Sequence, residues 1–247
     1  METPTGFEAD AEAEDVNKEV LEQVKEKYKH LQPFSFRISS LKKENWNAQW
    51  ESNVEPVVIG DSVLIRAGFH PPDPRYPYDI IITPKMSFGT GHHPTTYLML
   101  KSQLSIEHAD KRVMDAGCGT AILSVMACKR GARYVEAFDI DEWSISNGIE
   151  NVEVNRCVNV RIRQGTISDF TWPEPFDILL ANINRNILLA EMHAYARHLA
   201  PHGILQLSGF YVKDIPDLIA EGARQGFEYV SQDDRDQWAT LRLRRNG

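Results

Sequence analysis

The sequence predicts an α/β protein built around a doubly wound, mostly parallel β-sheet. From residue 94 onward, short apolar runs alternate with segments whose apolar residues recur at helical spacing, which is typical of strands joined by helices. The first strand of this region ends in the turn Gly117-Cys118-Gly119. A glycine turn there is typical of a ligand site at the carboxyl edge of a parallel sheet.

The elements of this region follow one another in regular order. We expect strands over 112–117, 133–141, 160–164, 176–182, 204–209, 227–234 and 237–245. We expect helices over 95–104, 121–130, 144–155, 186–200 and 214–225. Strands that alternate with helices in this way form a parallel sheet with helices on both faces.

The elements ahead of residue 94 are shorter. An apolar stripe predicts a helix over 16–31, and an alternating segment predicts a strand over 34–38. The segment 57–66 predicts a hairpin that turns at 60–61. The four prolines within 68–77 predict a stiff extended stretch, which we take as a domain boundary.

Composition excludes several classes of protein. The chain has 247 residues, with 35 acidic and 27 basic side chains and a net charge of −8. It has no apolar run long enough to span a bilayer. Its first residues have neither a basic start nor an apolar stretch, so we expect no signal peptide. Three cysteines are too few for a disulfide scaffold, so we expect a cytoplasmic protein. The acidic balance suits a basic protein or a small-molecule partner, and we expect no direct nucleic-acid binding.

Two acidic residues identify the ligand expected at the glycine turn. Asp139 ends the next strand, at a spacing that lets its carboxylate accept both ribose hydroxyls of an adenosine. Asp115 precedes the glycines and would repel a pyrophosphate, but it would attract the ammonium and sulfonium of S-adenosylmethionine. A dinucleotide also needs a third glycine where Ile122 stands. We therefore expect S-adenosylmethionine rather than a nicotinamide cofactor, bound by Asp115, Gly117, Gly119 and Asp139.

A polar residue ends the apolar strand over 176–182. The amide of Asn182 can accept a hydrogen bond from an amine and direct the nitrogen lone pair at a methyl group. Methyl transfer is an in-line displacement in which positioning supplies much of the rate, so we expect Asn182 to be catalytic. His92 and His93 are adjacent and lack a third ligand at suitable spacing, so we expect no metal site.

Four motifs in this order resemble the ribosomal protein L-11 methyltransferase family. They are Phe88-Gly-Thr-Gly-His-His-Pro-Thr-Thr96, Asp115-Ala-Gly-Cys-Gly-Thr, Asp139-Ile-Asp and Leu180-Ala-Asn-Ile183. The resemblance implies a Rossmann-like, seven-stranded class I methyltransferase fold with a small N-terminal α+β extension. It implies S-adenosylmethionine as cofactor, held by Thr96, Gly117 and Asp139, with Asn182 near the reacting centre. The family usually has a third glycine where Ala121 stands.

The resemblance also implies a substrate and a domain order. The substrate is a basic ribosomal protein, L-11, methylated on its N-terminal α-amine and on lysine ε-amines. We expect an acidic tail and shortened substrate-recognition region over 1–43, a linker and hairpin over 44–93, and the cofactor-binding methyltransferase domain over 94–247. We favour a monomer. The alternatives are a methyltransferase of RNA or a small molecule, and a non-catalytic cofactor-binding assembly factor.

Overall fold

The structure is a computed structural model that describes residues 2–3, 6–7, 18–28, 55–85 and 87–247. It forms two compact units, Met1–Glu51 and Ser52–Gly247. In the first unit, β1 (Glu2–Thr3) pairs antiparallel with β2 (Gly6–Phe7), and α1 (Lys18–Tyr28) lies within the helix predicted over 16–31. The strand predicted over 34–38 lies outside the described residues.

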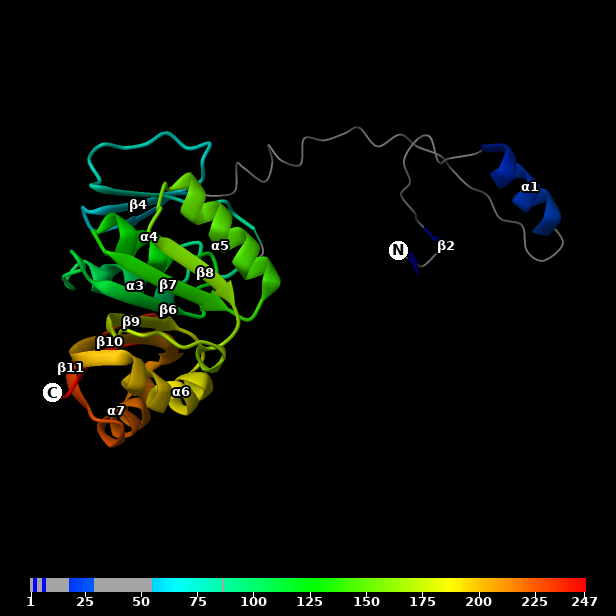
Figure 1. The fold of residues 1–247 in the computed structure, drawn as a ribbon. Coiled ribbons are helices and arrows are strands. Elements are labelled where there is room, and N and C mark those ends of the chain that lie inside the picture. The colour runs from blue at the N-terminus through cyan, green and yellow to red at the C-terminus, as the bar shows by residue number, and fades with distance from the viewer. Residues whose placement is uncertain (1, 4–5, 8–17, 29–54, 86) are drawn as a thin grey trace. The chain divides into compact units, whose positions relative to one another are not determined.

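The second unit contains the predicted α/β sheet, which has seven strands in the order β11-β12-β10-β9-β6-β7-β8 (Figure 1). The strands are β6 (Arg112–Ala116), β7 (Tyr134–Asp139), β8 (Val160–Gln164), β9 (Phe176–Asn182), β10 (Leu199–Tyr211), β11 (Phe227–Arg235) and β12 (Trp238–Arg245). Strands β6 to β10 are parallel, and only β12 runs antiparallel to its neighbours. The predicted fold class is confirmed.

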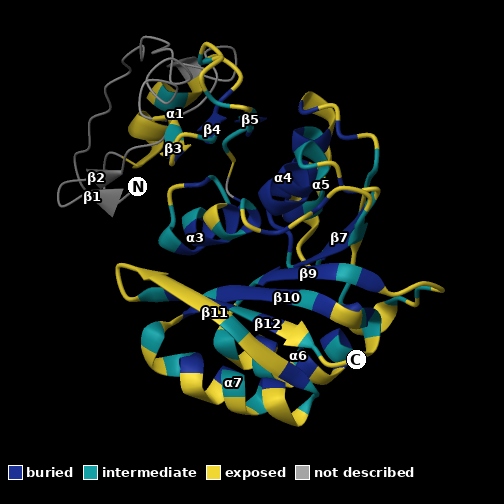
Figure 2. Ribbon diagram, turned by 90° about the vertical axis from the view of Figure 1, so that its left-hand side faces the viewer, coloured by how far each residue is buried: buried dark blue, intermediate teal, exposed yellow. Residues whose placement is uncertain are grey.

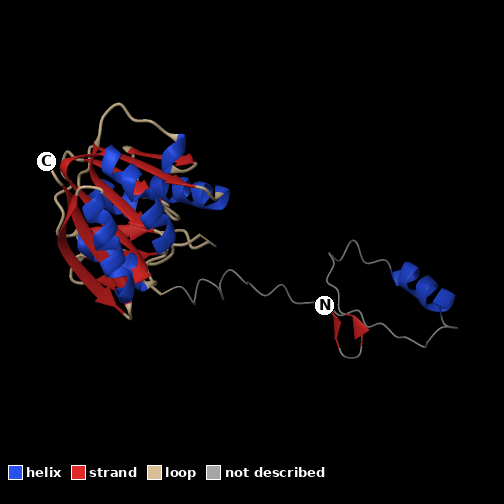
Figure 3. Cartoon of the chain, turned by 90° about the horizontal axis from the view of Figure 1, so that it is seen from below, coloured by secondary structure: helices blue, strands red, loops and turns tan. Residues whose placement is uncertain are grey.

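Helices cover both faces of this sheet (Figures 1 and 3). Figure 2 shows α3 (Pro94–Gln103), α4 (Ile122–Lys129) and α5 (Glu142–Val154) on one side, and α6 (Arg185–His198) and α7 (Ile215–Arg224) on the other. Single 3-10 turns at Ile167–Asp169 and Val212–Asp214 follow β8 and β10. None of the helices in the described part of the chain combines the length and apolar character needed to cross a membrane.

The apolar run that predicts β9 is buried on both sides. Ile178 and Leu180 belong to the core under α3 and α4, whereas Leu179 and Ala181 belong to the core over α6 and α7. Successive side chains of a strand point to opposite faces, so a strand covered twice needs an apolar residue at every position. This burial on both faces explains why the run is continuous rather than alternating.

A second, three-stranded sheet precedes the large one. It contains β3 (Val57–Ile59), β4 (Val63–Arg66) and β5 (Tyr78–Ile81). The predicted hairpin is confirmed, although three residues, 60–62, connect its strands. The predicted boundary over 68–77 is wrong, because β4 and β5 on either side of it pair as parallel neighbours. The prolines there make a stiff connection within one unit.

The end of α6 and the start of β10 also differ from the prediction. The helix ends at His198 rather than at 200, and β10 already begins at Leu199, which pairs with Phe176. The register then shifts between Leu199 and Ile204. A strand with such an irregularity shows no regular apolar pattern at its start, so sequence alone found only its second half.

Truncating β9 tests the doubly covered sheet. We expect Leu180→Ala to lower the free energy of unfolding by about 2–5 kcal/mol, because Leu180 is fully buried and its loss leaves a cavity. The matched control is Val158→Ala, at a side chain that is 99% exposed, which we expect to change stability little. Urea unfolding measures both, and equal effects would contradict the packing described.

Candidate active site

The ends of β6, β7 and β9 bring the predicted site residues together. Ala116 pairs with Phe138 on one side and with Ala181 on the other. The next residues along the three parallel strands are Gly117, Asp139 and Asn182, which therefore lie at the same level of the sheet. This is the carboxyl edge, where parallel α/β sheets bind their ligands.

The glycine turn has a backbone that only small residues tolerate. Gly117 and Gly119 have φ values of +67° and +51°. A Cβ at Gly117 would overlap Cγ2 of Ile183, and a Cβ at Gly119 would overlap the carbonyl oxygen of Phe88. Because the two glycines carry no Cβ, a ligand can approach the backbone of the turn closely. Ala121 also adopts a positive φ, of +59°, in the left-handed region that favours glycine.

Asp139 holds the glycine turn and keeps free acceptor positions. Its Oδ2 accepts a hydrogen bond from the N–H of Gly119 at 2.9 Å, and its Oδ1 accepts one from the N–H of Asp141 at 3.1 Å. A carboxylate offers about four lone-pair positions, so one remains free on each oxygen. This arrangement fits the two hydroxyls of a ribose.

Asp115 is fully buried beneath the turn and has one occupied and one unoccupied oxygen. Its Oδ2 accepts hydrogen bonds from the backbone N–H of Ser124 at 3.1 Å and from the Ser124 hydroxyl at 2.6 Å. Its Oδ1 has no hydrogen-bond partner among the described residues. Burial raises the pKa of Asp115 to about 7, the Ser124 hydrogen bonds oppose that rise, and the nearby charge of Asp139 adds to it. A cation beside Oδ1 would favour the charged carboxylate.

Two further polar atoms at this edge are buried without a partner in the described structure. They are Oδ1 of Asn182 and Oγ1 of Thr96, which lies in the first turn of α3. A buried acceptor or hydroxyl that no protein group satisfies is available to bond a ligand or a water molecule. Thr96 and Asn182 were both predicted as site residues from the sequence.

The loop before α3 lies directly on the glycine turn. The carbonyl of Phe88 accepts a hydrogen bond from the N–H of Thr120 at 2.9 Å, and the hydroxyl of Thr120 donates to the carbonyl of Gly89 at 2.6 Å. His93 caps α3 by accepting from the N–H of Thr95. Burial lowers the pKa of His93, which favours a neutral ring at this edge.

Sequence reasoning missed four residues that build the site. Ser124 fixes Asp115, and Asn151 donates from α5 to the carbonyl of Thr120 at 3.0 Å. Ile183 packs against Gly117, and Gly209 in β10 allows the carbonyl of Ile183 to approach. Only Gly209 carried a signal, since a glycine after an apolar strand indicates a bulge or a close backbone approach.

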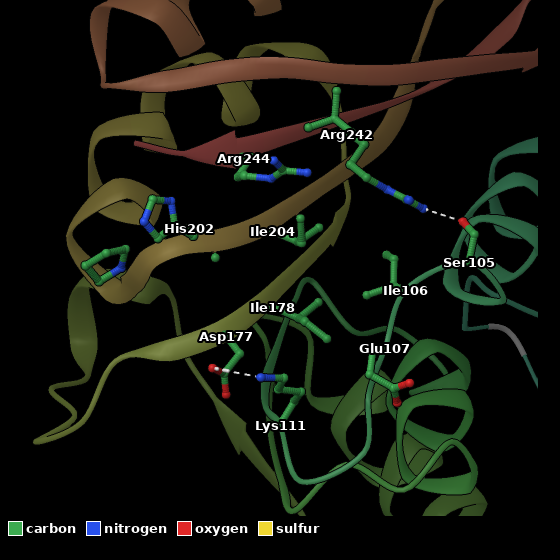
Figure 4. Close-up of a pocket in the computed structure, with 13 residues that line it drawn as sticks. Ser105, Ile106, Glu107, Lys111, Asp177, Ile178, His202, Ile204, Arg242 and Arg244 are labelled. Carbon is green, nitrogen blue, oxygen red and sulfur yellow. Dashed lines mark hydrogen bonds and ion pairs between the residues drawn. The ribbon is translucent and has the colours of Figure 1, made fainter. Parts of the chain in front are cut away.

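A cavity of about 390 Å³ lies elsewhere on the sheet (Figure 4). It is lined by Lys111 and Asp177, which lie at the starts of β6 and β9, and by Ile204 and Arg242. This is the amino edge, opposite to Asp139 and Asn182, so the cavity is not part of the candidate active site.

Adding a methyl group at Gly209 tests the close approach of β9 and β10. We expect Gly209→Ala to lower the free energy of unfolding by about 2–4 kcal/mol, because φ is +94° and the new Cβ would overlap the Ile183 carbonyl. The matched control is Gly60→Ala, where φ is +54° but no atom lies within 4 Å. It should cost only about 1–2 kcal/mol of backbone strain. If urea unfolding shows that both variants lose the same free energy of unfolding, the close approach of β9 and β10 is refuted.

The raised pKa of Asp115 predicts a pH-dependent stability. The folded state retains a proton on Asp115 that the unfolded state loses above pH 3.8. The contribution of Asp115 to the free energy of unfolding therefore falls as the pH rises towards about 7. Asp115→Asn keeps an acceptor for Ser124 without the charge. The free energy of unfolding of this variant, relative to that of the wild-type chain, should rise by up to about 4 kcal/mol between pH 4 and pH 7 and then stay constant. Parallel stability curves for the two proteins, measured by urea unfolding, would contradict this.

Comparisons with known proteins point to one family. The profile of the family described as ribosomal protein L11 methyltransferase (PrmA) matches residues 4–246. The ribosomal protein L11 methyltransferase of Bacteroides fragilis is 42% identical over 210 residues, covering 85% of this chain and 75% of its own. The protein of the same name from Porphyromonas gingivalis is 47% identical over 200 residues, covering 81% and 69%.

Solved structures share the fold. A ribosomal protein L11 methylase from Lactobacillus delbrueckii subsp. bulgaricus superposes with a TM-score of 0.71 at 24% identity, covering 78% of this chain and all of the other. A methyltransferase from Pyrococcus furiosus has a TM-score of 0.58 at 19% identity, covering 68% and 90%. With the family profile and the relatives above, these findings show that the chain belongs to the ribosomal protein L11 methyltransferase (PrmA) family.

Proposed function

We propose that this chain transfers methyl groups from S-adenosylmethionine to amines of large-subunit ribosomal protein L11, its N-terminal α-amine and lysine ε-amines. The observation that best supports this function is the buried, unpartnered Oδ1 of Asn182, level with the bare turn at Gly117 and with Asp139. The substrate follows from the family and from the names of the relatives in Bacteroides and Porphyromonas.

The residues at the carboxyl edge fit the cofactor. Asp139 would accept the ribose hydroxyls, and the backbone of Gly117 and Gly119 would lie against the methionine part. The free oxygen of Asp115 would face positive charge, and Thr96 would donate or accept through its unpartnered hydroxyl. When bound, the cofactor supplies a methyl group on a positively charged sulfur, which is a good leaving group.

Asn182 would position the amine for the transfer. Its Oδ1 accepts an N–H of the neutral amine and so directs the nitrogen lone pair at the methyl carbon. On accepting the methyl group, the amine held by Asn182 would release a proton to water. Holding the amine nitrogen in line with the methyl carbon lowers the activation barrier of the transfer, because the reactants no longer have to find this alignment.

The charge of the carboxyl edge suits a basic substrate. The segments 139–143, 164–169, 182–186, 208–217 and 232–238 hold nine acidic and three basic side chains. A negative surface around the site raises the encounter rate of a positively charged protein. The proposal keeps residues 1–43 for substrate recognition, 44–93 as linker and hairpin and 94–247 for cofactor binding, in a monomer acting in the cytoplasm.

Labelled methyl transfer tests the function directly. Purified chain with radiolabelled S-adenosylmethionine is offered separated ribosomal proteins in one reaction and ribosomal RNA in another. We expect label in protein L11, on amines. Label in RNA, or in no ribosomal component, would contradict the proposed substrate and favour one of the alternative functions.

Two substitutions separate the cofactor role from the catalytic role. Asp139→Ala should weaken S-adenosylmethionine binding at least tenfold, about 1.4 kcal/mol, because the ribose contacts are lost. Asn182→Ala should lower kcat at least tenfold with a smaller change in cofactor affinity, because the substrate amine loses the hydrogen bond that orients it. Calorimetry and steady-state kinetics measure these effects.

The matched control is Asn186→Ala, an exposed asparagine four residues after Asn182. It should leave both kcat and cofactor affinity unchanged. If Asn182→Ala weakens binding and turnover equally, Asn182 only binds the cofactor and the catalytic assignment is wrong.

A further inference from the structure

The charged side chains of the large sheet divide between its two edges. The segments at the amino edge are 105–112, 129–134, 155–161, 173–177, 197–203, 224–228 and 242–245, the last being the end of the antiparallel β12. They hold twelve basic and five acidic side chains. The carboxyl edge described above has the opposite sign. The net charge of −8 therefore conceals a positive surface, which we call the basic edge.

The cavity of about 390 Å³ lies within the basic edge (Figure 4). Arg242 and Arg244 line it from β12, and Lys111 lines it from the start of β6. Glu107 and Asp177 also line it, so cations outnumber acids there by three to two. Arg242 is held in place, since it donates to Oε1 of Gln206 at 2.9 Å and to the Ser102 hydroxyl at 2.7 Å.

Three ion pairs of the basic edge are long and exposed. Lys111 lies 3.9 Å from Asp177, Arg133 lies 3.8 Å from Glu174, and Arg244 lies 3.5 Å from Glu228. These side chains are all at least one-third exposed. Long, exposed ion pairs contribute little to stability. Their cations can therefore bind an external anion with little loss of folding free energy.

We infer that the basic edge binds the phosphate backbone of RNA. Ten of its twelve cations are arginines, whose planar, forked donors match phosphate oxygens. Strands lie about 4.8 Å apart, so seven strands give an edge of roughly 29 Å, which is long enough for several phosphates. The choice of RNA over other polyanions rests on the proposed function, because a ribosomal protein functions in contact with RNA.

This assignment leaves the catalytic edge free. RNA on the basic edge and a basic protein at Asn182 would lie at opposite ends of the same strands and would not compete for space. The expectation of no nucleic-acid binding came from the acidic net charge and from the scarcity of clustered basic side chains along the sequence. Net charge cannot reveal two edges of opposite sign, because helices and strands carry each charged segment to one edge or the other.

Charge reversal on each edge tests the inference. Binding of the full chain to a fluorescein-labelled RNA hairpin is measured by anisotropy at about 50 and 200 mM salt. Arg133→Glu with Arg244→Glu should weaken binding at least tenfold and reduce its salt dependence. Lys213→Glu with Arg235→Glu makes the same change in net charge at the carboxyl edge and should alter RNA affinity less than twofold.

Three results would overturn the inference. The first is that the wild-type chain does not bind RNA at the lower salt concentration. The second is that the two double variants lose equal amounts of RNA affinity. The third is that polyglutamate displaces the labelled RNA as effectively as unlabelled RNA does. The last would indicate an acidic protein as partner. Circular dichroism and cofactor affinity check that both variants are folded. Methyl transfer to free L11, measured without RNA, tests the proposed function separately.

Discussion

The close approach of β9 to its two neighbours is the constraint on which the site depends. Ile183, directly after β9, packs its side chain against Gly117 of the turn after β6 and its carbonyl against Gly209 of β10. Neither contact leaves room for a Cβ. The two glycines thereby hold three strand ends together, and Asn182, one residue earlier, is fixed at the level of the glycine turn and Asp139. A fixed position matters because methyl transfer depends on alignment.

The direction of the parallel strands gives each edge of the sheet a separate role. At the carboxyl edge, glycines, unpartnered acceptors and acidic segments suit a cationic cofactor and a basic protein. At the amino edge, the segments that begin the parallel strands, together with the end of β12, carry ten of the chain's sixteen arginines. A single sheet can in this way present two surfaces of opposite charge, separated by the length of its strands.

Much of this architecture could be predicted from the sequence because its signals are local. Apolar runs and helical periodicity gave most strands and helices, and the motifs around Thr96, Gly117 and Asp139 gave the site. What could not be predicted depends on contacts between distant segments. Ser124 meets Asp115 only through the turn, and β4 and β5 pair across a proline-rich stretch that resembles a boundary. Which edge a charged segment occupies is likewise a property of topology.

The proposed function requires the cofactor to bind at the carboxyl edge of the large sheet. Backbone amide NMR of the full chain, with and without S-adenosylhomocysteine, locates the binding site. We expect the resonances of Gly117, Gly119, Asp139 and Asn182 to shift together as one site saturates. Shifts confined to Ile106 and Ile204, which line the cavity at the amino edge, would contradict it.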